Sequence, residues 1–79
     1  MPKYYFHMHI NGRSLPDRRG VSFRDGTEAC ARAVRCTPLT LRKTASRRRN
    51  TYVAVEVSDG ERALYVVRGK LIIEKRARQ

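Results

Sequence analysis

The chain has 79 residues, and its 18 Lys and Arg side chains against seven Asp and Glu give a formal net charge of +11 at pH 7. This length allows a single domain, residues 1–79, and excludes a two-domain enzyme or a large buried pocket, since so small a domain buries only a modest share of its surface. No apolar run approaches the roughly 20 residues that cross a bilayer, and the start lacks a secretory signal pattern, so we expect a cytoplasmic protein without membrane insertion.

Residues 3–10 alternate between two kinds of side chain, which predicts a β-strand. One face of this strand carries Tyr4, Phe6, Met8 and Ile10, and the other carries Tyr5, His7 and His9. Asn11-Gly12 follows and predicts a two-residue hairpin turn, because both residue types tolerate positive φ. Pro16 lacks a backbone donor, so for the returning arm we expect an extended piece and then a short edge strand at residues 21–23.

A helix is predicted to start at Asp25, whose carboxylate can accept from the first turn while Glu28 reaches back to it. An apolar stripe at helical spacing then runs through Cys30, Ala33, Val34, Thr37, Leu41 and Ala45. Because these side chains are mostly small, the helix can lie close to a sheet. Pro38 removes one backbone hydrogen bond and predicts one of two outcomes. Either the helix kinks there, or, as we favour, it ends near Cys36 and a second short helix starts at Thr37.

Residues 51–57 alternate again and predict a second strong strand, with a turn at residues 58–61 and a return strand from Ala63 to Val67. Gly69 is interpreted as a bulge or bend, and residues 74–79 as a basic tail that frays. Together the elements predict the α+β class. The architecture is a small two-layer sandwich, in which a three- to four-stranded antiparallel sheet of order β-β-α-β-β carries one main helix, kinked or broken at Pro38. The uncovered sheet face is expected to carry Tyr5, His7, His9 and Tyr52.

Several short motifs resemble one known family. They are Met-Pro-Lys-Tyr-Tyr-Phe-His at the start, Asn11-Gly12, Pro16-Asp17, Gly20-Val21, the stretch from Asp25 to Ala33, and Val53 to Val57 with Asp59-Gly60. They are similar to motifs of small bacterial proteins, common in rhizobia and their relatives, that form the domain of unknown function 6894. The resemblance spans roughly residues 2–67 and implies a stand-alone α+β protein with no assigned activity and no assigned site residues.

The chain departs from that family's pattern at two places. Members usually carry acidic residues where Arg18 and Arg19 stand, and a continuous Ala/Glu-rich helix where Thr37-Pro38 stands. A role for the charge of +11 can therefore belong to this protein alone.

Two histidines and two cysteines are candidates for chemistry, and for each of them we favour a structural role. His7 and His9 share a strand face, but two imidazoles alone do not complete a zinc site. Cys30 lies on the apolar stripe and is interpreted as a buried thiol, and Cys36 as a more exposed one. The two thiols are six residues apart on a helix and point in different directions. We therefore expect no catalytic residue, no metal, no cofactor and no small-molecule substrate.

Basic residues are the strongest departure from average composition. The candidate nucleic-acid contacts are Arg42, Lys43, Arg47, Arg48 and Arg49 at the end of the helical region, with Arg18 and Arg19 in a loop. Guanidinium groups bind phosphate in a bidentate manner, although cations also stabilise helix C-termini and keep small proteins soluble. We expect a non-enzymatic module that binds a partner or associates with itself as a homodimer, through an exposed sheet face or edge strand. The alternative is non-specific nucleic-acid binding through residues 42–49.

Overall fold

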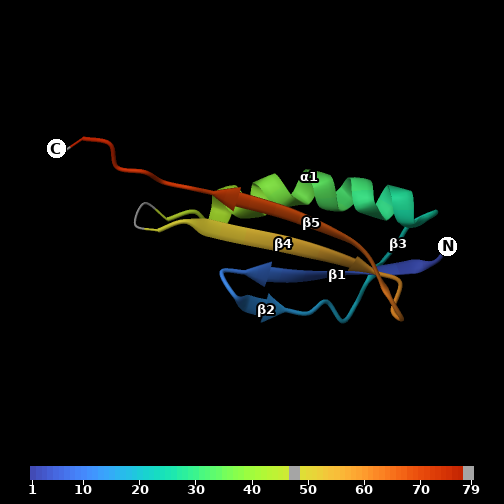
Figure 1. Cartoon of the computed structure of the whole chain (residues 1–79). Helices are drawn as coiled ribbons and strands as arrows, with labels where there is room; N and C mark the ends of the chain where they lie inside the picture. The colour runs from blue at the N-terminus through green and yellow to red at the C-terminus, as the bar shows by residue number, and fades with distance from the viewer. Residues whose placement is uncertain (47–48, 78–79) are drawn as a thin grey trace.

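The computed structural model describes residues 1–46 and 49–77. In chain order the elements are β1 (Lys3–Ile10), β2 (Arg13–Leu15), β3 (Val21–Ser22), α1 (Gly26–Thr44), β4 (Thr51–Ser58) and β5 (Ala63–Leu71). The strands form one antiparallel sheet of order β2-β1-β4-β5, and β3 pairs with the first residues of β1. Helix α1 lies along β4 and β5 (Figure 1). The predicted α+β class is confirmed, but the sheet has five strands, because residues 13–15 form a strand that the sequence left as an irregular arm.

The hairpin between β1 and β2 follows from Asn11-Gly12, as predicted. Asn11 has φ 50° and Gly12 has φ 81°, so both turn residues are in the left-handed region that a two-residue turn requires. Asn11 then extends the pairing of β1 with β4, since its N–H donates to the Tyr52 carbonyl and its Oδ1 accepts from the Tyr52 N–H, both at 2.9 Å. The turn therefore fixes the position of Tyr52 as well as the direction of β2.

The start of α1 is capped by Asp25, whose Oδ1 accepts from the Glu28 N–H at 2.9 Å, as predicted. Glu28 does not reach back to Asp25, and its Oε1 instead accepts from the Arg24 N–H at 3.4 Å. The expected break at Pro38 is wrong, since α1 continues through it to Thr44. Pro38 has no N–H to donate to the carbonyl of Val34, four residues earlier. Both residues are on the exposed side of the helix, where water can donate to that carbonyl instead.

The face of α1 that meets the sheet is displaced from the predicted stripe. Its buried residues are Ala29, Ala33 and Thr37, at a spacing of four, with Leu41 packed beside them. Val34 is 55% exposed and Ala45 lies outside the helix, so the prediction for these two residues is wrong. A row at spacing four drifts slowly around the helix, and the twisted strands beneath it turn in step with that row.

Gly69 is a point of close approach and not a bulge. A Cβ there would lie 3.2 Å from Thr37 Cγ2 and 3.4 Å from Leu41 Cδ1, and β5 runs without interruption through this residue. The irregularity in the β4–β5 ladder lies at the other end of the pair, at Val57/Ser58. The absence of a side chain at Gly69 therefore lets α1 pack closely on the sheet.

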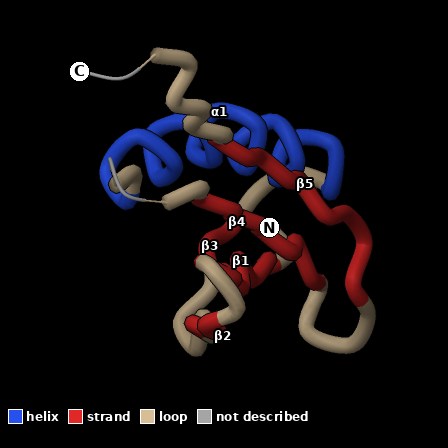
Figure 2. The backbone as a smooth tube through the Cα atoms, turned by 60° about the vertical axis from the view of Figure 1, so that its left-hand side comes forward, coloured by secondary structure: helices blue, strands red, loops and turns tan. Residues whose placement is uncertain are grey.

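The core lies between α1 and the inward face of the central strands. Its buried members are Tyr4, Phe23, Ala29, Ala33, Val53, Val55 and Val57. The tube view shows the helix on one side of the sheet and the opposite side without a covering element (Figure 2).

Within the described residues, no helix has the length and hydropathy needed to span a membrane.

Candidate binding site on the open sheet face

The sheet face opposite α1 is built by the residues that alternate with the buried valines of β4. Tyr52, Ala54 and Glu56 occupy these positions, and the strand register sets their neighbours. In one cross-strand row Ala54 lies between His9 and Arg68; in the next rows Tyr52 is opposite Lys70, and Glu56 lies between His7 and Val66. This face therefore carries the side chains predicted for it, together with two cations from β5.

One end of the open face is covered by its own loops. A Cβ at Gly20 would lie 2.8 Å from Tyr5 Cε2, and a Cβ at Gly60 would lie 3.4 Å from Tyr5 Cε1. The Tyr5 ring therefore has one loop against its Cε2 atom and another against its Cε1 atom. The Tyr5 and His7 rings are stacked, with centroids 6.4 Å apart and planes 7° apart. These two rings therefore help to hold the loops at this end of the sheet.

Asp17 fastens the loop between β2 and β3 to this end of β1. Its carboxylate accepts from the N–H groups of Phe6, Arg19 and Gly20 at 3.0–3.1 Å, and its own N–H donates to His7 Nδ1 at 3.0 Å. Burial of the carboxyl raises its pKa, but the three backbone donors, with a smaller contribution from His7, outweigh that effect. The pKa of Asp17 therefore lies below its ordinary value of 3.8.

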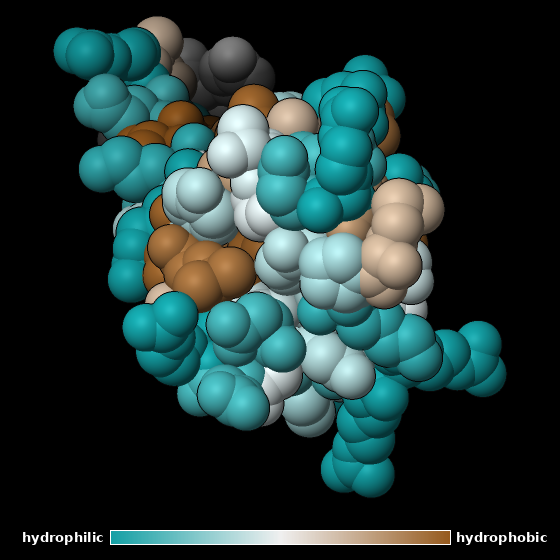
Figure 3. Space-filling view, turned by 90° about the vertical axis from the view of Figure 1, so that its right-hand side faces the viewer, coloured by the Kyte–Doolittle hydropathy of each residue, from teal (hydrophilic) through white to brown (hydrophobic). Residues whose placement is uncertain are grey.

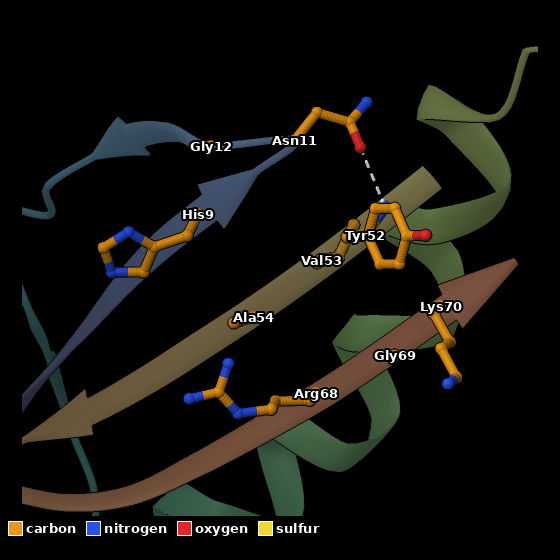
Figure 4. Close-up of a pocket in the computed structure, with 9 residues that line it drawn as sticks. All are labelled: His9, Asn11, Gly12, Tyr52, Val53, Ala54, Arg68, Gly69 and Lys70. Carbon is orange, nitrogen blue, oxygen red and sulfur yellow. Dashed lines mark hydrogen bonds between the residues drawn. The ribbon is translucent and has the colours of Figure 1, made fainter. Parts of the chain in front are cut away.

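The other end of the open face is hollowed. A depression of about 440 Å³ is lined by His9, Asn11, Gly12, Tyr52, Val53, Ala54, Arg68, Gly69 and Lys70. Figure 4 shows His9 on β1 and the Arg68 guanidinium on β5 on either side of Ala54, with the Tyr52 ring and Lys70 at the far end. The small Ala54 side chain leaves the floor low between these larger groups. Tyr52 is 49% exposed, so part of its side chain is accessible from the hollow.

Within residues 1–46 and 49–77, neither of the two cations at this hollow forms an ion pair. Arg68 and Lys70 are exposed. Within the part of the chain that the structure describes, the ion pairs are Arg24–Glu28 and Arg76–Glu74, on the helix start and the C-terminal tail. His9 Nδ1 is in hydrogen-bonding contact with Ser14 Oγ at 3.2 Å, which fixes the ring at the rim of the hollow. The site thus combines a stacking surface with free positive charge.

The basic residues that were predicted from the sequence and are described lie at two opposite ends of the sheet. Arg42 and Lys43 are exposed in the last turn of α1, near the end of the sheet that holds the hollow, and Arg49 is exposed just before β4. Arg47 and Arg48 lie outside the described residues. The loop of Arg18 and Arg19 is held at the opposite end of the sheet by Asp17.

Arg68 and Lys70 are the site residues that the sequence reasoning missed. Their alternation with Val67 and Gly69 indicates that both side chains lie on one face of a strand. Only the β4–β5 register shows that this face is the open one, beside Ala54 and Tyr52.

The thiols and histidines lie apart from one another in the described residues. Cys30 and Cys36 are both free and half-buried, so Cys30 is less buried than predicted. Cys36 lines a smaller groove of about 200 Å³ with Phe6, Met8 and Phe23. Among residues 1–46 and 49–77, no three His, Cys, Asp or Glu side chains are grouped so that they could hold a metal ion.

Comparison with known proteins gives one match. Neither the curated proteins nor the solved structures contain a chain that matches this one. Residues 3–68 match the sequence profile of a family described as domain of unknown function (DUF6894), which covers all of the sheet except the end of β5, together with the helix. The chain therefore belongs to the DUF6894 family of domains of unknown function.

Proposed function

We propose that the protein is a non-enzymatic binding module that takes single-stranded nucleic acid on its open sheet face. The observation that supports this most directly is the hollow at His9, Tyr52, Arg68 and Lys70, where two unpaired cations lie beside an exposed aromatic ring. Single-strand binders combine a basic path for the phosphates with aromatic rings on which bases stack. The residues lining the hollow include no carboxylate and no thiol, which favours binding over catalysis.

The geometry favours a single strand over a duplex. Bases of a single strand are free to stack on Tyr52 and to enter the depression above Ala54, whereas paired bases are already stacked. Arg68 and Lys70 are two residues apart on one strand, on the same side of the sheet, so successive phosphates can follow β5. A cytoplasmic location, expected from the sequence, would give access to such a ligand.

The helix end offers a second basic surface, and it makes a different prediction. In the sequence-based hypothesis the contacts are residues 42–49, of which Arg42, Lys43 and Arg49 are described and exposed. The last two turns of α1, residues 38–44, contain no aromatic residue. This end of the helix therefore supports charge attraction without stacking. The two surfaces can be separated by paired substitutions that remove equal charge.

The test is fluorescence anisotropy of a labelled oligouridylate of about 12 nucleotides, which exceeds the footprint of most small sheet surfaces. Binding is expected at about 50 mM salt, where phosphate contacts are strong. The double variant Arg68→Ala/Lys70→Ala should reduce the slope of log affinity against log salt by about 1.4, from about 0.7 for each lost contact with a single strand. Tyr52→Ala should weaken binding at least about fivefold, and Tyr52→Phe should not.

The controls remove the same charge elsewhere. Arg32→Ala/Arg35→Ala changes two exposed cations on α1 and should leave the salt slope nearly unchanged. If Arg42→Ala/Lys43→Ala abolishes binding while Arg68→Ala/Lys70→Ala does not, the ligand lies at the helix end and the open-face proposal is wrong. Absence of any binding at low salt would contradict both.

A further inference from the structure

We infer that two copies of the chain form a symmetric dimer by pairing β5 with β5 in antiparallel orientation. β5 lies at an edge of the sheet, with β4 on one side and no strand on the other (Figure 1). It is nine residues long and contains no proline, so its outer row of backbone donors and acceptors can be continued by another strand. The inference is independent of the nucleic-acid proposal.

The sequence of β5 is complementary to itself in one register. Val67 is the middle of Ala63–Leu71, so pairing Val67 with Val67 of the second copy aligns the whole strand. Tyr65 then lies opposite Gly69 of the second copy, so a large side chain meets a residue without one. Val66 lies opposite Arg68 of the second copy, so an apolar residue and not another cation faces the guanidinium.

Neighbouring registers that keep the faces matched are less favourable for two different reasons. A shift of two residues in one direction brings Arg68 opposite Arg68 of the second copy, and directly opposed like charges destabilise a strand pair. A shift in the other direction leaves Lys70 and Leu71 beyond the end of the second β5, which begins at Ala63, so fewer residues are paired.

Helix α1 presents a flank without charge on the same side as this edge. Leu41 contacts β5 at Gly69, so its flank of α1 faces the β5 edge. Arg32 and Cys36 line the groove above β1, so they mark the opposite flank. The flank toward the β5 edge carries Thr27, Ala31, Val34, Pro38 and Leu41. Spacings of four and three residues repeat along this row, as in the seams of packed helices. The nearest cations, Arg35 and Arg42, follow Ala31 and Pro38 by four residues and lie about 40° further round the helix, next to this row.

The geometry of the paired sheets brings the two helices into contact. Strands in a sheet are about 4.8 Å apart, and α1 lies between β4 and β5, contacting both equally. Two such helices related by the β5 pair would be separated by about 9–10 Å, twice the strand spacing, which matches the 8–10 Å of packed helices. The partner for Val34, which is 55% exposed, is therefore the same flank of the second copy.

The charge of the chain opposes self-association. Two molecules of +11 repel each other, and β5 itself carries Arg68 and Lys70, so the uncharged flank of α1 must supply much of the favourable contact. Seen from the end with the N-terminus and the β4–β5 turn, the surface is mainly hydrophilic and its hydrophobic patches are small (Figure 3). Pairing along β5 would also leave both open-face hollows accessible on one side of a continuous sheet.

The test is sedimentation equilibrium of the full chain across protein and salt concentration. We expect a monomer–dimer equilibrium that is strengthened by salt, which is the opposite of the salt dependence of phosphate binding. Val34→Arg should raise the dimer dissociation constant at least about tenfold, because two cations would face each other in the helix contact. A monomer at all concentrations, or a dimer unaffected by Val34→Arg, would overturn the inference.

Substitutions of Val66 by residues of opposite charge test the register, because they should change the dimer affinity in opposite directions. Val66→Glu places a carboxylate opposite Arg68 twice and should tighten the dimer roughly two- to tenfold, whereas Val66→Lys should weaken it. Within one chain Val66 is opposite Glu56, so the stability of the monomer should change in the reverse direction. Val21→Arg, an equally exposed apolar residue on the other side of the sheet, is the matched control and should have no effect. Tightening by Val66→Lys would contradict the register.

Discussion

Asp17 ties the loop between β2 and β3 to strand β1, at the end of the open face that the loops cover. Its carboxylate and N–H together make hydrogen bonds to Phe6, Arg19, Gly20 and the His7 ring. Three of these satisfy backbone donors that no strand partner reaches. The loop that carries Arg18 and Arg19 is therefore held by a charged acceptor, and its stability depends on the ionisation of that acceptor.

Replacing Asp17 by Ala should lower the free energy of unfolding at pH 7 by about 1–2 kcal/mol, since hydrogen bonds to a charged group are strong but solvent exposure weakens them. The pKa of Asp17 is lowered by folding, so this stabilisation is fully present above its ordinary value of 3.8 and is lost as the pH falls through the folded value. Urea unfolding at pH 7 and near pH 3 should therefore show a smaller difference between variant and native chain at the acid pH.

Two comparisons make that result specific to Asp17. Asp17→Asn keeps one acceptor oxygen and should lose less stability than Asp17→Ala at pH 7. Glu61→Gln removes an exposed carboxylate from the β4–β5 turn and should change the free energy of unfolding by less than about 0.5 kcal/mol. A difference between native chain and Asp17→Ala that grew toward acid pH would contradict the assigned role.

At the scale of elements, the contact between α1 and β5 depends on a missing side chain. Gly69→Ala would place a methyl group 3.2 Å from Thr37 Cγ2 and 3.4 Å from Leu41 Cδ1, so the Thr37 side chain must give by a few tenths of an ångström. We expect a loss of about 1–2 kcal/mol in the free energy of unfolding, as for other overpacked sites. In a double-mutant cycle with Thr37→Ser, which removes Cγ2 and keeps the hydroxyl, the double variant should be less destabilised than the sum of the single variants. Strict additivity would show that Thr37 does not carry the clash.

Pro38 gives the second prediction about an element. It lies inside α1 on the exposed side, where it withholds a hydrogen bond from the helix without filling the core. Pro38→Ala should raise the free energy of unfolding by about 1–2 kcal/mol, less than the roughly 3 kcal/mol helix penalty because proline also restricts the unfolded chain. Thermal unfolding followed by circular dichroism, at a concentration low enough to keep the chain monomeric, measures it. A lower melting temperature would show that the helix needs the proline.

Local patterns predicted much of the whole molecule. Alternation at residues 3–10 and 51–57, the Asn11-Gly12 turn and the Asp25 cap were all found in the structure. The displaced stripe on α1 could not be predicted, because Ala29 and Cys30 are both small enough for a close contact and only the sheet decides between them. Pro38 misled because its cost is local, whereas the packing of Thr37 and Leu41 on β5 stabilises the helix on both sides of it.

The candidate site was harder to predict than the fold. A count of cations points to residues 42–49, where they are adjacent in sequence. The hollow instead combines His9 from β1, Tyr52 from β4 and Arg68 from β5, which only the strand register brings together. In the function that we propose, the charge of +11 attracts an anionic partner, while the topology of the sheet sets the surface that binds it.

The most direct measurement is the change in amide chemical shifts when the isotope-labelled full chain is titrated with a single-stranded oligouridylate. If the open sheet face binds the strand, the largest changes should fall on the amides around the hollow, at residues 9–12, 52–54 and 68–70. Changes confined to the end of α1 and the segment before β4, or to the loop of Arg18 and Arg19, would contradict that account. So would a spectrum that the oligonucleotide leaves unchanged.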